Sequence, residues 1–281
     1  MANRMILNKS ILSRLSLIKY YFEKGCEQSY KSPPFCYFSI LNFHDVVELF
    51  LILGAETLNA AVREKMSILD YWNVINQQME DIKLSHKASF KKLNRARINF
   101  KHYGITPNKE EIESFRILTR NFFDENTPII FSIEFDEISL IDLVQIDVVK
   151  EKLVEVQNLN KESKFRKSLI RLGETYRILI SYKRFYSSIS HYFTTGPSMA
   201  ENKLEYIHEM LRFILLDIDF RKYVKFNLLT YVYVLNSIDS YVNKEEERIC
   251  TKEQVNFCMN FIIECALKIQ EFIDTYESIK F

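Results

Sequence analysis

Glycine and proline are scarce in this chain, with 5 of each among 281 residues. An all-β protein needs many tight turns, and these two residues mark most of them, so the composition argues against an all-β fold. The 5 cysteines form no CxxC pair, and their odd count and loose spacing argue against both a disulfide framework and a zinc site. Cysteines without such a pattern fit a reducing compartment, so we expect a cytoplasmic protein.

Excess charge and long apolar runs are also missing. The 38 basic and 37 acidic residues give a net charge of +1 at pH 7. No global field therefore draws the chain to nucleic acid, and any phosphate contact has to come from a local cluster. No apolar run approaches the roughly 20 residues that cross a bilayer, so we expect no membrane contact. The acid-free N-terminal stretch is interpreted as the first helix of the fold.

Short catalytic motifs are absent as well. The sequence has no GxGxxG, no GxxxxGK[ST], no GxSxG and no HExxH. Nucleotide-binding folds, serine hydrolases and zinc proteases are therefore not expected, and neither is any cofactor.

The pattern that is present is helical, because apolar residues recur at steps of three and four along most of the chain. We expect helices over about residues 8–24, 37–59, 63–81, 86–103, 109–126, 147–159, 163–193, 204–240 and 251–278. Gly25, Ser85, Gly104 and Thr251 are the expected caps. The segment 127–135, TPIIFSIEF, is expected to be an extended connector.

These elements predict an all-α protein in two parts. The first is a helical bundle over residues 8–145, and further long helices follow over residues 160–281. Polar residues cluster near residue 160, in QNLNKES, where the boundary is expected. The second part either forms its own domain or packs with the first as one unit.

The expected helix over 86–103 has a basic face opposite an apolar stripe. The stripe comprises Phe90, Leu93, Ala96, Phe100 and Tyr103. The opposite face contains Arg95, Asn99 and His102, and Lys91 and Lys92 border it, while Arg97 lies nearer the edge of the stripe. Histidine can transfer a proton near neutral pH, and an arginine can hold a phosphate with its fork of donors. This face is either an ordinary solvated surface or a site that acts on phosphate.

The stretch RINFKH, from Arg97 to His102, resembles the R-x(4–6)-H signature of HEPN-domain proteins. Because the signature allows four to six intervening residues, Arg95 to His102 also matches it. HEPN proteins are helical bundles, and many are metal-independent ribonucleases of toxin and antiviral defence systems. The resemblance extends over about residues 8–145 and implies a HEPN-like bundle.

The resemblance also implies a mechanism. Two protomers of a homodimer would face each other across a cleft that holds RNA. His102 would assist attack of the ribose 2′-hydroxyl, and either Arg97 or Arg95 would stabilise the phosphorane, leaving a 2′,3′-cyclic phosphate. Asn99 is a candidate for orienting either group, because Ile98 occupies the position after Arg97 where active members commonly have a polar residue. The expected RNA contacts are Lys91, Lys92, Lys101 and Tyr103.

Other interpretations stay open. The chain is alternatively a non-catalytic helical module that regulates, senses a ligand or binds a protein partner. His44, Asp45 and Glu48 are either a thin metal-ligand set or, as we favour, a polar contact between helices. Basic and aromatic residues alternate over 166–193, which is typical of single-stranded RNA binding but also of any packed amphipathic helix.

Overall fold

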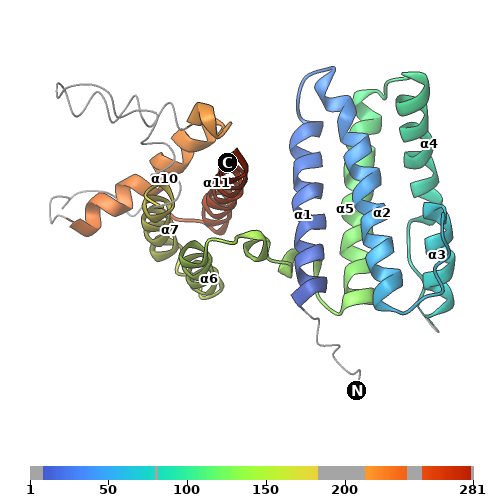
Figure 1. Cartoon of the computed structure of the whole chain (residues 1–281), viewed down its shortest axis with the longest axis horizontal. Coiled ribbons are helices and arrows are strands. Elements are labelled where there is room, and N and C mark those ends of the chain that lie inside the picture. The colour runs from blue at the N-terminus through green and yellow to red at the C-terminus, as the bar shows by residue number, and fades with distance from the viewer. Residues whose placement is uncertain (1–8, 80–81, 183–212, 239–248, 280–281) are drawn as a thin grey trace. The chain divides into compact units, whose positions relative to one another are not determined.

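The computed structural model describes residues 9–79, 82–182, 213–238 and 249–279. Within these ranges all regular elements are helices, as Figure 1 shows, so the all-α prediction is confirmed. The chain divides into two compact units, Met1–Leu140 and Ile141–Phe281. The division falls before the expected limit at residue 145 and before the polar cluster near residue 160, because the helix between these points packs with the second unit.

The N-terminal unit is a helical bundle built around one central helix. Its elements are α1 (Lys9–Ser29), η1 (Phe35–Phe38), α2 (Ser39–Thr57), α3 (Ile68–Gln77), α4 (Lys87–Tyr103), α5 (Lys109–Phe131) and η2 (Phe135–Glu137). Helix α2 contacts α1, α3, α4 and α5 (Figure 1). The helix predicted over 63–81 is shorter than expected, and it begins at a capping box formed by Ser67 and Asp70.

The sequence of α2 explains its central position, since it is apolar nearly all round. The ring of Phe50 is fully buried and meets Phe122, Phe123 and Phe131 edge-on, with centroids 5.3–5.4 Å apart. The expectation that no apolar segment is long enough to cross a membrane is wrong for Phe35–Thr57, which has the length and composition to do so, although 61% of its most apolar window is buried inside the protein. That burial is compatible with the core helix of a soluble protein.

Helices continue through two places where the sequence predicted that they would end. Gly25 lies inside α1 and does not cap it. A Cβ atom at Gly25 would lie 3.1 Å from both Asn42 Cβ and a ring carbon of Phe43, so the glycine permits the close approach of α1 and α2. The extended connector over 127–135 is also wrong, because α5 continues through Pro128 to Phe131. Burial of Ile130 and Phe131 favours this last turn although proline removes one backbone hydrogen bond.

Of the two caps predicted for α4, one is wrong and the other is confirmed. His86, and not Ser85, occupies the N-cap, with a left-handed φ of 66°. Gly104 ends the helix with a φ of 67°, as expected from its freedom to adopt this conformation. The apolar stripe is shorter than predicted, because Phe90 and Leu93 are buried but Tyr103 is 71% exposed.

The C-terminal unit contains η3 (Leu140–Leu143), which begins at the junction, α6 (Asp147–Lys161), α7 (Phe165–Ile180), α10 (Phe220–Ile238) and α11 (Lys252–Ile279). Helix α7 contacts α6, α10 and α11. Thr251 caps α11 as predicted, since its Oγ1 accepts a hydrogen bond from the amide of Gln254 at 3.3 Å. Of the basic and aromatic stretch 166–193, residues 183–193 lie outside the described residues, as does the expected loop 194–203.

Candidate functional site

Helix α4 carries charge of one sign only. It contains six Lys and Arg residues and no Asp or Glu, although the chain as a whole is nearly neutral. Within the described ranges, no carboxylate pairs with the side chains of Lys91, Lys92, Arg95, Arg97 and Lys101. Basic side chains elsewhere are commonly neutralised; Arg120, for example, pairs with Asp124 at 2.8 Å and Asp136 at 2.9 Å. The helix therefore presents an uncompensated positive surface.

Arg95, Asn99 and His102 share one face of this surface. Arg95 and His102 are exposed, and Asn99 between them is half-buried. At about 100° per residue, positions seven apart differ by only about 20° around the helix, and they lie about 10 Å apart along its axis. The two longer side chains can therefore approach the same ligand from either side of Asn99.

Arg97 does not share that face. It lies five residues before His102, which is about 140° around the helix. Its side chain is half-buried on the side of Phe90 and Leu93, and its Nε atom is buried without a hydrogen-bond partner. Within one protomer, the structure therefore brings together Arg95, Asn99 and His102, and it places Arg97 apart from them.

The expected RNA-contacting residues are accessible. Lys91, Lys92, Lys101 and Tyr103 are all exposed, and Lys101 lies in the last turn of α4 with His102. Positive side chains in that turn also interact favourably with the negative end of the helix dipole. The aromatic ring of Phe100 anchors the same turn to η1, with its centroid 5.5 Å from that of Phe38.

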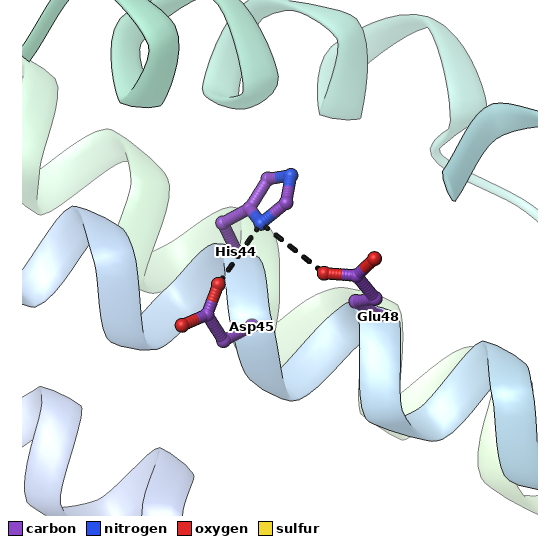
Figure 2. Close-up of side chains that lie close together, drawn as sticks. All are labelled: His44, Asp45 and Glu48. Carbon is purple, nitrogen blue, oxygen red and sulfur yellow. Dashed lines mark hydrogen bonds and ion pairs between the residues drawn. The ribbon is translucent and has the colours of Figure 1, made fainter. Parts of the chain in front are cut away.

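The second candidate, His44, joins α2 to α4. Its ring is 3% exposed and stacks on Phe90 at 5.5 Å between centroids. Nε2 lies 3.0 Å from Asn94 Oδ1 on α4. Nδ1 lies 3.2 Å from Asp45 Oδ1 and 4.0 Å from Glu48 Oε2, and Figure 2 shows these two contacts. The favoured polar contact between helices is therefore present, through an asparagine that the sequence patterns did not single out.

A second unpredicted asparagine positions the start of α4. Asn126 on α5 is fully buried, and its Oδ1 accepts a hydrogen bond from the Ser85 amide at 3.0 Å. Its Nδ2 donates to Ser85 Oγ at 3.0 Å and to the Phe122 carbonyl at 2.7 Å. The Trp72 indole adds a bond to the Ser85 carbonyl at 3.2 Å. No local signal identifies such a residue, because its partner lies 41 positions away in the sequence.

No family model, curated protein or solved structure matches the chain.

Proposed function

We propose that the protein is a metal-independent endoribonuclease of HEPN type, acting as a cytoplasmic homodimer in a toxin or antiviral defence system. One observation supports this proposal most directly. Helix α4 combines an uncompensated positive surface with an exposed histidine, His102, and an exposed arginine, Arg95, on one face. Phosphate binding needs the first feature, and proton transfer near neutral pH needs the second.

The proposed reaction is an internal transfer within RNA. His102 of one protomer takes the proton from the ribose 2′-hydroxyl, and the 2′-oxygen forms a bond to phosphorus. The bond from phosphorus to the 5′-oxygen breaks, and that oxygen receives a proton from the imidazolium of the second protomer's copy of the same residue. The products are a 2′,3′-cyclic phosphate and a 5′-hydroxyl. Arg95 stabilises the extra negative charge on the phosphorane with paired N–H donors.

The neighbouring exposed side chains complete the proposed RNA interface. Lys91, Lys92 and Lys101 would contact successive phosphates, and the exposed ring of Tyr103 would stack on a base. Asn99 would orient the scissile phosphate or the imidazole. Arg97 is assigned a structural role in this proposal, because it lies on the face that packs toward the bundle.

A non-catalytic partner-binding module is the alternative, and a different observation favours it. Large apolar side chains are exposed around the C-terminal end of α4 and in η1: Phe35 at 57%, Phe38 at 47%, Tyr103 at 71% and Ile105 at 57%. Exposed apolar groups of this kind are typical of protein-binding surfaces. In this case the basic face would select an acidic partner.

The deciding experiment incubates the purified full chain with mixed RNA in a chelator. We expect cleavage that leaves 2′,3′-cyclic phosphate ends, and we expect His102→Gln and Arg95→Gln to abolish it. Both residues are exposed, so thermal melting of these variants should match that of the parent protein. Arg97→Gln is the matched control on the same helix and should keep its cleavage chemistry.

Two results would reject the nuclease. Undiminished cleavage by His102→Gln would eliminate the proposed site. No cleavage by the parent chain, together with a stable stoichiometric complex with another protein, would establish the alternative. In cells, expression of the parent chain should arrest growth, and His102→Gln should relieve the arrest.

A further inference from the structure

Three potential metal ligands converge on α2, and none of them belongs to the basic face of α4. They are Nδ1 of His44 and one carboxylate oxygen each from Asp45 and Glu48. All three atoms lie within 4.8 Å of one another. Figure 2 shows the ring of His44 with its Nδ1 turned toward both carboxylates. The adjacent pair and the i, i+4 spacing place the three side chains on one side of the helix.

The charges in this cluster are not balanced by basic side chains. In the part of the chain that the structure describes, neither Asp45 nor Glu48 pairs with a lysine or arginine. Apart from His44, the hydrogen-bond partner of Asp45 among the described residues is the Tyr21 hydroxyl on α1, which donates to Oδ2 at 3.5 Å. Asp45 Oδ1 faces the imidazole, 3.2 Å from Nδ1 of His44. Two carboxylates and a buried ring nitrogen face one another, and in the described part of the chain no lysine or arginine pairs with them.

Asn94 determines what the imidazole can offer to these carboxylates. Its Oδ1 lies 3.0 Å from Nε2 of His44, and because an amide oxygen can only accept a hydrogen bond, Nε2 is the donor in this contact and Nδ1 is the nitrogen that faces the carboxylates. Nδ1 lies toward Asp45 Oδ1 and Glu48 Oε2, and either a proton on Nδ1 or a bound metal ion can hold these three atoms together. Metal-binding histidines are typically held in this way, with the second ring nitrogen bonded to an oxygen.

We propose that His44, Asp45 and Glu48 bind a divalent first-row metal ion, Zn²⁺ or Mn²⁺. One imidazole with two carboxylates is a donor set that both ions accept. Ligand atoms about 2.1 Å from a shared ion are at most about 4.2 Å apart. The His44–Asp45 and His44–Glu48 distances of 3.2 and 4.0 Å meet that limit without movement. The remaining pair, Asp45 and Glu48, has its ligand oxygens within 4.8 Å of each other.

The ion would brace the contact between α2 and α4. Only Phe90 and Leu93 of α4 are fully buried, so this helix depends on few apolar contacts. A metal on Nδ1 makes Nε2–H a stronger donor to Asn94, which strengthens a polar link between the two helices. The buried ring of His44 is not placed to meet RNA, so the site is structural and independent of the proposed cleavage reaction.

The test uses chelator-treated full chain titrated with Mn²⁺, with free ion measured by electron paramagnetic resonance. Mn²⁺ is the better probe because the chain's thiols bind it poorly. We expect one ion per chain, and affinity at least about 10-fold weaker in the near-isosteric variants Asp45→Asn and Glu48→Gln. Asn94→Leu should weaken binding by about 10–100-fold, the usual effect of losing such a partner. Zn²⁺ should raise the melting temperature of the parent chain but not of Glu48→Gln.

The matched control is Glu125→Gln, which disrupts a second histidine–carboxylate pair. His86 Nε2 lies 3.1 Å from Glu125 Oε2 on α5, where a third ligand is not found among the described residues. Metal affinity should be unchanged in this variant. The proposal is wrong if the parent chain binds neither Mn²⁺ nor Zn²⁺. It is also wrong if Glu48→Gln binds the ion with the same affinity as the parent. In either case the cluster holds a proton and no metal ion. Neither result would affect cleavage in chelator, so the two proposals fail separately.

Discussion

The positive surface of α4 gives a quantitative prediction for RNA binding. Four of its exposed side chains are free of carboxylate partners among the described residues: Lys91, Lys92, Arg95 and Lys101. If each one neutralises a phosphate of single-stranded RNA, the slope of log K against log salt concentration is about −0.7 × 4, or about −2.8. Raising the salt from about 50 to about 200 mM should then weaken binding about 50-fold.

The measurement is fluorescence anisotropy of a labelled uniform single-stranded RNA, bound to the His102→Gln chain so that it is not cleaved. Changing all four side chains to glutamine should bring the slope close to zero, and each single change should reduce its magnitude by about 0.7. The control neutralises four exposed lysines on other elements and makes the same change in net charge: Lys65, Lys161, Lys167 and Lys252. An equal loss of slope in the control variant, or an unchanged slope in the α4 variant, would refute a local phosphate-binding surface.

Three further predictions concern stability. Phe50→Ala should lower the free energy of unfolding by about 3–5 kcal/mol, measured by urea titration, because a fully buried ring in contact with three others is removed. Asn126→Leu should cost about 1–3 kcal/mol, because the Ser85 amide loses its acceptor, and hydrogen exchange should rise first in residues 84–90. Burial raises the pKa of Cys258 to about 12, so the folded chain keeps a proton that the unfolded chain loses above about pH 9. The free energy of unfolding should therefore fall as pH rises from 9 toward 12, by up to about 1.4 kcal/mol per pH unit from this thiol, and Cys258→Ala should make the fall shallower.

Helical periodicity predicted the fold class because an amphipathic helix records its buried side in local spacing. The errors came where tertiary packing outweighed a local signal. Glycine is typical of a helix end, yet Gly25 permits the close approach of α2 to the C-terminal part of α1. The segment 127–135 was expected to be extended, yet two buried apolar residues, Ile130 and Phe131, favour the helix that continues through Pro128. The residues against which Gly25 and Phe131 pack, Phe43 and Phe50, lie outside any short window of sequence.

The candidate site was likewise predictable from the sequence only in part. The common face of Arg95, Asn99 and His102 follows from helix geometry alone, so it could be predicted as soon as the helix itself had been predicted. The residues that position this helix were not predictable. Asn94 meets His44 across 50 positions, and Asn126 meets Ser85 across 41. An asparagine inside a helical pattern gives no sign of whether it is solvated or paired, because only the tertiary fold supplies its partner.

Helix geometry also decides between the two arginines that fit the R-x(4–6)-H spacing. A signature counts residues, whereas a ligand is bound by side chains that project in similar directions. Five positions turn a helix by about 140° and seven by about 20°, so on one continuous helix the longer spacing brings arginine and histidine to a common face. Arg95 is also exposed, while the Nε atom of Arg97 is buried. A guanidinium that must meet a phosphate needs its donors free, so in the proposed nuclease we expect Arg95, and not Arg97, to act with the His102 of the same helix.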